Sequence, residues 1–361
     1  MNDALLGFFT PWAIFGLLLL LHLLVPARHV VGYVEDEKTG ERLRYRLNGL
    51  PILFLSVGGW FVLGRLGWVP FDWLWQTRWV GLAGAATLGL ISTMAVVLTA
   101  PSTGKPLLAD LFLGRRFNPQ AFGGRVDAKM LLYLLGAVLL ELNLLSFAAH
   151  HRMTFGANAS PGVTLHVALF TWFLCDYLFF ERVHLYTYDL FAERVGFKLV
   201  WGCLTFYPYF YAVGLWSTAD RPDPGAPAWM SILAVVLFFA GWALARGANM
   251  QKFFFKLDPA RPFLGVIVPE SVSDGRHSLL CNGFWGVSRH VNYLGEVLMA
   301  SGLALALGWP GLAWPWLYPL YYVLLLGTRE RDDDRRCAEK YGELWERYRS
   351  RVRWRVVPGL Y

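Results

Sequence analysis

The sequence has few charged residues for its length. Lys, Arg, Asp and Glu make up 16% of its 361 residues, whereas 56% are hydrophobic. A soluble globular chain carries about 25% charged residues, so this chain has too few to cover a surface exposed to water. Aromatic residues are abundant, with 17 Trp and 26 Phe, and amphipathic rings are typical of membrane–water interfaces. The composition therefore excludes an ordinary soluble domain and indicates a membrane protein.

Several motifs of nucleotide binding and catalysis are absent. The sequence contains neither G-x-G nor G-x-x-x-x-G-K-[ST], and neither H-E-x-x-H nor G-x-S-x-G. Its four cysteines form no C-x-x-C pair, so neither a disulfide framework nor a zinc site is indicated, and we expect no metal. A bound nucleotide would have to be held by helix ends and basic side chains.

Long apolar runs predict an all-α, polytopic transmembrane helix bundle of about nine or ten spans. A helical span needs ~20 mostly apolar residues. The first run, Leu5 to Val25, lacks a basic segment before it and is interpreted as an anchored span rather than a cleavable signal. A tenth span fits only within 262–268 or as a re-entrant segment. The nine predicted spans are 8–26, 50–64, 79–99, 131–149, 163–181, 197–216, 229–245, 291–308 and 311–327.

Basic residues alternate between rich and poor loops. Five Lys and Arg lie in 27–49 but two in 65–78, and ten follow residue 328. Because basic residues accumulate in cytoplasmic loops, this alternation places the amino terminus outside and the carboxyl terminus in the cytoplasm. The same rule explains the net charge of +7, so we expect no nucleic-acid partner.

A first polar constellation ends the predicted span at 229–245. Asn249, Lys252 and Lys256 are spaced i, i+3 and i+7, so they share one face of a helix. Two ammonium groups and an amide on one face favour an anion site. The alternative is ordinary basic flanking of a span.

A second constellation precedes the span at 291–308. Gly283 and Gly286 allow backbone to approach a ligand closely, Trp285 offers a stacking face, and Arg289 and His290 can contact phosphate. The helix amino terminus that follows favours an anion. The alternative is an interfacial aromatic belt with a basic cap.

A third constellation lies in the tail. Arg329, Asp333 and Lys340 fall on one helical face, and Tyr341 and Tyr348 belong to a second, aromatic stripe. Opposite charges on one face suit a zwitterionic or nucleotide ligand. The alternative is a solvated salt-bridge helix with an aromatic packing seam.

Polar groups also occur at membrane depth, where ionisable residues are costly and mark functional cavities. Asp176 lies deepest within its predicted span, whereas Glu181 lies near a cytoplasmic end, where its side chain can reach water. The complete set is Glu141, Asn143, His166, Asp176, Glu181 and His184.

Five segments, in this order, resemble the sterol reductase family of integral membrane enzymes, which reduces carbon–carbon double bonds at the 14, 7 or 24(28) positions of sterols with NADPH. The R-H-x-N-Y element within them is shared with membrane methyltransferases. The segments are Gly40–Leu50, Gly114–Pro119, Arg246–Lys252, Trp285–Gly295 and Arg329–Pro358.

The resemblance implies a sterol-side pocket in residues 1–245 and a cytoplasmic, helical NADPH region in 246–361. Lys256 departs from the family's usual Arg, Val291 from Pro and Cys203 from Asp. The implied cofactor residues are Asn249, Lys252, Lys256, Trp285, Arg289, His290, Asn292, Tyr293, Arg329, Asp333, Lys340, Tyr341 and Tyr348. The candidate proton donors are Glu181, Tyr207, Tyr211, Asp333 and Tyr348.

The mechanism implied by the resemblance is protonation of a sterol double bond followed by hydride transfer from NADPH, with activity like that of a delta(14)-sterol reductase. The partners are then a sterol and membrane lipids. The location is the endoplasmic reticulum in a eukaryote or the inner membrane in a bacterium. Two alternatives remain open, an S-adenosylmethionine-dependent membrane methyltransferase of the isoprenylcysteine type and a non-catalytic sterol-binding protein.

Overall fold

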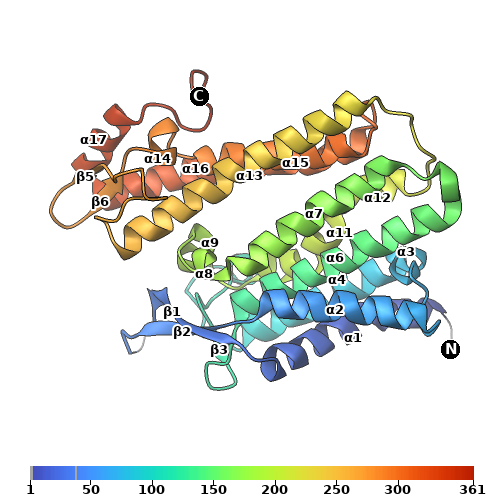
Figure 1. The fold of residues 1–361 in the computed structure, drawn as a ribbon. Coiled ribbons are helices and arrows are strands. Elements are labelled where there is room, and N and C mark those ends of the chain that lie inside the picture. The colour runs from blue at the N-terminus through green and yellow to red at the C-terminus, as the bar shows by residue number, and fades with distance from the viewer. Residues whose placement is uncertain (1–2, 37–38) are drawn as a thin grey trace. The chain divides into compact units, whose positions relative to one another are not determined.

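The computed structural model describes residues 3–36 and 39–361. It divides into two compact units, residues 1–224 and 225–361 (Figure 1). The functional division expected at residue 246 falls within α13, the helix that opens the second unit. Its elements are α13 (Ala228–Leu257), β5 (Ser271–Ser273), β6 (Ser278–Leu280), α14 (Phe284–Val287), α15 (Val291–Ala306), α16 (Ala313–Tyr341) and α17 (Glu343–Arg351).

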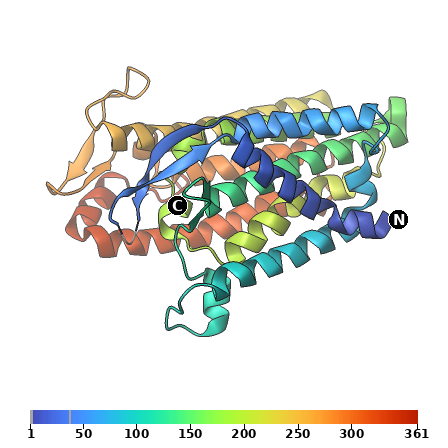
Figure 2. The same cartoon turned by 90° about the horizontal axis from the view of Figure 1, so that it is seen from below.

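The first unit is built mainly from helices, with two small hairpins. The β1–β2 hairpin runs directly into α2 (Figures 1 and 2). The elements are α1 (Asp3–Leu24), β1 (Arg28–Glu35), β2 (Arg42–Leu47), α2 (Gly49–Arg65), α3 (Trp73–Gln76), α4 (Arg78–Leu98), α5 (Leu107–Leu113), β3 (Gln120–Ala121), β4 (Val126–Asp127), α6 (Ala128–Phe155), η1 (Gly156–Asn158), α7 (Pro161–Phe179), α8 (Glu181–His184), α9 (Tyr188–Ala192), α10 (Phe197–Trp201), η2 (Gly202–Phe206), α11 (Tyr207–Phe210) and α12 (Val213–Thr218).

Within the described residues, five helices are long and apolar enough to cross a membrane: α1, α4, α6 with its η1 extension, α7 and α13. The shorter apolar helices α2 and α15 coincide with two further predicted spans. The expected all-α, polytopic architecture is thereby confirmed.

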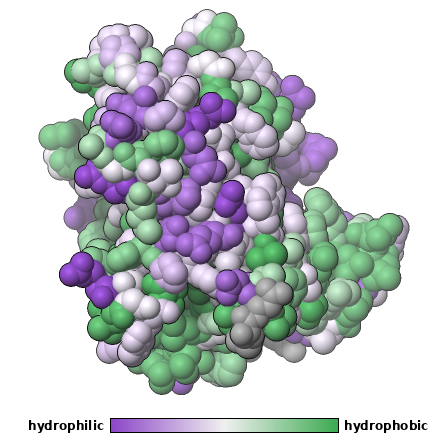
Figure 3. Space-filling model, turned by 90° about the vertical axis from the view of Figure 1, so that its right-hand side faces the viewer, coloured by the Kyte–Doolittle hydropathy of each residue, from purple (hydrophilic) through white to green (hydrophobic). Residues whose placement is uncertain are grey.

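The exposed surface of these helices is suited to lipid. Large apolar side chains point outward from α1, α2 and α13, among them Leu17, Phe54 and Ile232. Such an excess of exposed apolar surface is unusual in a soluble protein. On the face drawn in Figure 3, by contrast, hydrophilic residues gather near the centre, with apolar residues around them.

The span expected at 197–216 is interrupted. It consists of α10, a π-helical turn (η2), α11 and α12. Pro208 has no amide hydrogen to complete an α-helical bond, and the π turn directly precedes the helix that contains it. Because π turns inside helices occur frequently at functional sites, this interruption marks a segment of interest.

Glycines hold α13 and α15 together in the second unit. A Cβ atom on Gly295 would lie 2.5 Å from the carbonyl oxygen of Gly241, and one on Gly302 would lie 2.7 Å from that of Ala234. Small residues at such crossings let two helix backbones approach closely. This contact fixes the end of α13 relative to the start of α15, where the predicted cofactor residues lie.

The expected hairpin of the last two spans is present. α15 ends at Ala306, the chain turns through Trp309–Gly311, and α16 begins at Ala313. α16 then continues far past the predicted span, to Tyr341, as one helix. Its second half is highly charged, so this helix carries the apolar segment and the predicted Arg329–Lys340 face on one rigid element.

Candidate functional site

Three lysines of the second unit form a cluster, here called the lysine cluster. Lys252 and Lys256 lie one turn apart near the end of α13, one turn beyond Asn249, and Lys340 lies in the last turn of α16. The Lys256 ammonium interacts electrostatically with both other lysines. Like charges held together repel one another, and a bound polyanion removes that repulsion. The lysine cluster is therefore suited to a ligand with several negative charges.

Trp285 provides an aromatic face beside this cluster. Its indole N–H donates to the carbonyl oxygen of Ala248 at 2.8 Å, and Lys252 Nζ lies 5.1 Å from the ring centroid. The loop before it is fixed by Gln251, whose Oε1 accepts the N–H of Phe284 at 2.9 Å. Gly283 has φ +61°, and a Cβ there would collide with the Gln251 amide, so only glycine fits. Gly283 therefore serves the approach of a protein side chain rather than of a ligand.

His290 lies directly before α15 and is buried. Its ring stacks on Tyr293 with centroids 4.8 Å apart, and Nδ1 lies 4.0 Å from Asp333 Oδ2. Burial, together with the charge of Lys252, lowers the pKa of His290 to about 3, so the imidazole is neutral at pH 7. The sequence suggested a phosphate contact, but a neutral ring offers only a hydrogen bond.

Two buried polar atoms next to this ring have no hydrogen-bond partner. They are His290 Nε2 and Asn292 Oδ1. Buried polar groups are normally satisfied, so each of these two atoms needs an explanation. A polar ligand seated between the lysine cluster and α15 would provide one.

Asp333 joins this group from α16. Burial raises the pKa of the Asp333 carboxyl, and the charges of Lys252, Arg336 and Arg329 oppose that rise. The helical face predicted from Arg329 and Asp333 therefore exists in the fold, and it meets α13 at Lys252.

Arg289 belongs to a different environment from its neighbour His290. The Arg289 side chain is 5% exposed and lines a cleft of about 530 Å³ together with Arg349 and Arg355. Its backbone N–H donates to the carbonyl oxygen of Trp354 at 2.9 Å, and that of His290 donates to Arg355 at 2.8 Å. The carboxyl-terminal segment thus occupies two donors at the start of α15 that the sequence suggested for an anion.

The two tyrosines of the carboxyl-terminal tail, Tyr341 and Tyr348, also lie in different surroundings. Tyr348 is buried and stacks on Trp345 at 5.0 Å in a small core with Cys281, and burial raises its pKa. Tyr341 lies at the edge of that core, with Lys340 Nζ 5.0 Å from its ring centroid. The aromatic stripe is therefore chiefly a packing seam, and Tyr341 alone carries it to the lysine cluster.

In the first unit, Glu181 is held against the start of α2. Its Oε2 accepts the N–H of Gly49 at 3.1 Å, and a Cβ on Gly49 would lie 2.6 Å from Oε1. The preceding Asn48 donates its amide to the carbonyl oxygens of His22 and Val25, both at 3.1 Å. The Asn-Gly pair of the segment 40–50 thus has a physical role, since asparagine closes the end of α1 and glycine admits the carboxylate.

Tyr207 and Tyr211 follow the π turn and contact each other, with ring centroids 4.6 Å apart. Both are half-buried, and Cys203 is buried within the turn itself. Tyr177, on α7, interacts electrostatically with Tyr207, Cys203 and Glu181. Tyr177 is a site candidate that the sequence did not single out, because nothing in its own helical pattern distinguishes it from a packing aromatic residue.

Two of the polar groups at membrane depth form hydrogen bonds within the bundle, although Glu141 Oε2 and Asn143 Oδ1 have no hydrogen-bond partner. Glu141 Oε1 accepts the hydroxyl of Thr171 at 2.7 Å, and Asn143 donates its amide to the carbonyl oxygen of Pro208 at 2.9 Å. Both residues are 1% exposed, whereas Asp176, expected to be the deepest, is only half-buried. Helix rotation, which the sequence alone leaves open, decides this order.

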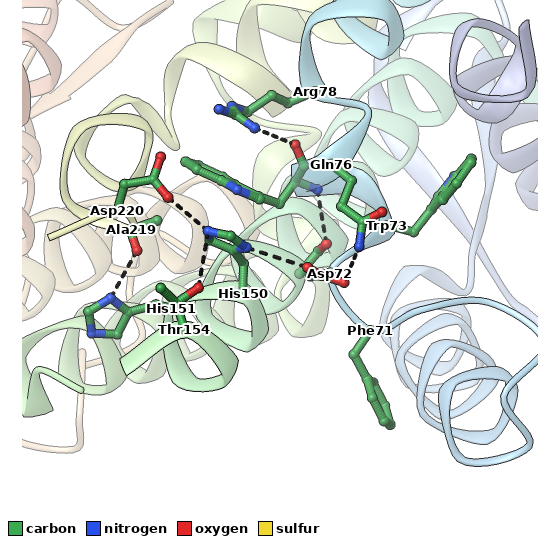
Figure 4. Close-up of polar contacts among 12 residues, drawn as sticks. Phe71, Asp72, Trp73, Gln76, Arg78, His150, His151, Thr154, Ala219 and Asp220 are labelled. Carbon is green, nitrogen blue, oxygen red and sulfur yellow. Dashed lines mark hydrogen bonds and ion pairs between the residues drawn. The ribbon is translucent and has the colours of Figure 1, made fainter. Parts of the chain in front are cut away.

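A dense polar network lies at the carboxyl-terminal end of α6 (Figure 4). His150 lies between two aspartates, with Nε2 2.8 Å from Asp220 Oδ1 and Nδ1 3.4 Å from Asp72 Oδ2. Its ring stacks on Trp75 at 4.7 Å, and Arg78 covers that indole at 3.7 Å. The network ties α3, α6 and the segment after α12 together, and we interpret it as structural.

The fold defines an all-α, polytopic membrane protein with a cluster of three lysines in its second unit. The chain matches the Ergosterol biosynthesis ERG4/ERG24 family over residues 2–361 and belongs to it. It is therefore a sterol reductase, an oxidoreductase acting on a sterol double bond.

Similar proteins occur in plants, bacteria and animals. The chain is 32% identical to a Delta(14)-sterol reductase of Arabidopsis thaliana, covering 94% of this chain and 91% of that protein. It is 31% identical to a Delta(14)-sterol reductase of Methylotuvimicrobium alcaliphilum (89% and 76%). It is also 32% identical to Delta(14)-sterol reductase TM7SF2 of Mus musculus (98% and 86%). The suspected family is thus confirmed, which sets aside the methyltransferase alternative.

Proposed function

We propose that this protein reduces the delta(14) double bond of a sterol with NADPH, and that NADPH binds at the lysine cluster. The names of the relatives support the position of the bond. The observation that carries the cofactor is the mutual proximity of Lys252, Lys256 and Lys340 beside Trp285.

The residues present fit a phosphorylated dinucleotide. A 2′-phosphate carries roughly −1.5 to −2 charge if it titrates like other phosphate monoesters, which the ammonium groups of the lysine cluster can neutralise. The Trp285 ring offers a stacking surface, and His290 Nε2 and Asn292 Oδ1 await polar partners. When bound, NADPH supplies the hydride. Asp333 and Arg329 then hold Lys252 and the ligand in place from α16.

The tyrosine pair Tyr207 and Tyr211 is the proposed source of the proton. Both side chains are half-buried and follow a π turn, whereas Tyr209 between them is buried in the core. A phenol that donates its proton to one carbon of the double bond leaves a cation on the adjacent carbon, which accepts the hydride. Tyr348 is a weaker candidate because it is sealed in an aromatic core.

The proposal places the carboxyl terminus in the cytoplasm, in agreement with the ten basic residues that follow position 328. The lysine cluster would then be open to cytoplasmic NADPH. The membrane is the inner membrane in a bacterium or the endoplasmic reticulum in a eukaryote.

Titration of the purified protein with NADPH and NADH tests the cofactor. We expect a clear preference for NADPH, and Lys252→Gln to weaken NADPH binding roughly tenfold or more while leaving NADH nearly unchanged. Lys105→Gln is the matched control, because Lys105 is exposed in a loop of the first unit. Equal affinity for both nucleotides would contradict the lysine cluster as a 2′-phosphate site.

Incubation with NADPH and a panel of 14-, 7- and 24-unsaturated sterols tests the reaction. Mass spectrometry should show a gain of two hydrogens on the 14-unsaturated sterol alone. A gain on another member of the panel would show that a different double bond is reduced. Binding of sterol without any turnover would favour the non-catalytic alternative.

A further inference from the structure

A cavity of about 280 Å³ lies in the first unit, at the junction of β2, α2 and the α7–α8 connection. Its walls are of two kinds. Leu50, Leu178 and Phe179 form an apolar side, and the polar side consists of Arg28, Asn48, Glu181 and Arg182. A cavity with one apolar and one polar wall suits the polar end of an amphiphilic molecule.

The polar wall presents hydrogen-bond acceptors. Both carbonyl oxygens near Asn48, those of His22 and Val25, require donors, which fixes the amide nitrogen towards them. The Asn48 side chain also forms a hydrogen bond with the imidazole of His22, which faces Asn48 Oδ1. Glu181 is 7% exposed and uses Oε2 for the N–H of Gly49, which leaves Oε1 as a second acceptor. Glu181 Oε1 is therefore the acceptor that this wall offers to a ligand that donates a hydrogen bond.

We infer that this cavity receives the 3-hydroxyl end of the sterol, with Glu181 as the acceptor of its hydroxyl hydrogen. The inference rests on the sterol substrate of the proposed function. A sterol has one hydroxyl on a rigid apolar ring system, so one donor and one acceptor satisfy its polar end. The lining guanidinium of Arg182 is the complementary donor to the hydroxyl oxygen.

Gly49 sets the depth of this site. Since any Cβ there would meet Glu181 Oε1 at 2.6 Å and Leu178 Cδ2 at 2.8 Å, only glycine allows the carboxylate to reach the α2 amide. That contact orients Glu181 and keeps its free oxygen in the cavity. Glu181 is on this view a positioning residue for substrate, and not the proton donor.

Equilibrium binding of two ligands, measured without NADPH, tests the inference. The probes are a 14-unsaturated sterol with a free 3-hydroxyl and its 3-O-methyl ether, which cannot donate. The wild-type protein should prefer the hydroxyl form by roughly tenfold, the value of one hydrogen bond. Glu181→Leu should reduce that preference to near unity while leaving affinity for the ether within about twofold.

Two controls separate the roles of Glu181. Glu181→Gln keeps an acceptor for Gly49 and a polar group for the hydroxyl, so kcat should stay within a few-fold and KM should rise modestly, whereas loss of an essential acid would lower kcat by at least about a hundredfold. Glu193→Gln changes a carboxylate of the same unit that pairs with Lys198 at 2.6 Å outside the cavity, and should alter neither ligand.

Three results would overturn the inference. They are equal binding of hydroxyl and ether by the wild-type protein, equal loss of both ligands in Glu181→Leu, and a collapse of kcat in Glu181→Gln. If Glu181→Leu does not fold, a sterol with a photoreactive group beside carbon 3 should label peptides around 47–51 and 178–182 in the wild-type protein, and labelling elsewhere contradicts the site. If the protein distinguishes the hydroxyl form from the ether but does not reduce the sterol, the proposed reaction is rejected. The inferred site for the 3-hydroxyl then still stands.

Discussion

The two units use polar groups in opposite ways. In the second unit, Lys252, Lys256 and Lys340 are like charges held together, and an anionic ligand would relieve their repulsion. In the first unit, polar side chains such as Glu181 and Asn48 form most of their hydrogen bonds with backbone groups, and few of their acceptor atoms remain for a ligand. If the proposed sites are right, the two units separate recognition of a charged, water-soluble molecule from recognition of a lipid with a single hydroxyl.

Their helices differ for a related reason. α13 and α15 are uninterrupted and held close by glycine contacts, so the residues proposed to bind the cofactor at their ends keep fixed positions. In the first unit, the segment around 197–218 is broken by a π turn and by Pro208, which turns Tyr207 and Tyr211 out of the regular helical pattern. Rigid helices hold the site for the anion, and an irregular one carries the residues proposed for proton transfer.

The sharpest way to break this division is to remove the phenols. We expect Tyr207→Phe or Tyr211→Phe to lower kcat by about 10²–10⁴-fold, the usual contribution of a general acid, while the Kd for NADPH stays unchanged. Single-turnover assays with equilibrium NADPH binding measure both. If neither variant loses more than about tenfold in kcat, the proton comes from outside the first unit's tyrosine pair.

The close contact between α13 and α15 at Gly295 is tested by Gly295→Ala. A methyl group 2.5 Å from the Gly241 carbonyl must separate α13 from α15, at a cost of about 3 kcal/mol in the free energy of unfolding, and should also weaken NADPH binding. Gly327→Ala is the matched control, because nothing lies within 4 Å of its Cβ position on α16. A similar melting temperature for both variants would show that the crossing tolerates side chains.

The stability of the second unit should depend on acid pH through His290. Because the pKa of His290 is lowered to about 3 in the folded protein, its contribution to stability is present above pH 6.5 and is lost as pH falls towards 3. Between pH 6.5 and 5 the loss is about 2 kcal/mol for this residue. Thermal unfolding of His290→Asn should depend less steeply on pH in this range, and an unchanged slope would place the sensitivity elsewhere.

The network of Figure 4 should matter for stability alone. His150→Leu leaves Asp72, which is 5% exposed, without its imidazole partner and should cost about 1–2 kcal/mol in the free energy of unfolding. Thr154→Val removes only an exposed hydroxyl 3.4 Å from the same ring and is the control. Loss of NADPH affinity in His150→Leu would contradict a purely structural role.

The smallest expected effect is a gain in affinity for NADPH. Lys256→Arg should tighten NADPH binding a few-fold, because a guanidinium binds phosphate through two parallel hydrogen bonds where an ammonium acts as a point charge. Binding of NADH should not change. An equal gain for NADH would mean that residue 256 contacts the shared pyrophosphate rather than the 2′-phosphate.

Several elements were predictable because their cause is local. The long apolar runs and the turn at Trp309–Gly311 follow from residue type in sequence order, and α16 keeps the predicted face of Arg329 and Asp333. The interruption at 197–216 was missed, since one proline in an apolar run of ordinary length does not reveal a π turn. Arg289 and His290 are adjacent in sequence, yet the fold places them in different surroundings.

The sequence by itself determined that this protein lies in a membrane, that it is helical, and that basic residues gather near its carboxyl end, because apolar length and charge act without knowledge of the fold. Only the tertiary structure decided which of these residues meet. Lys340 reaches Lys256 because α16 returns beside α13, and Glu181 reaches Gly49 across 132 positions because no Cβ stands between them. Such contacts depend on helix rotation and close packing, which a single sequence does not specify.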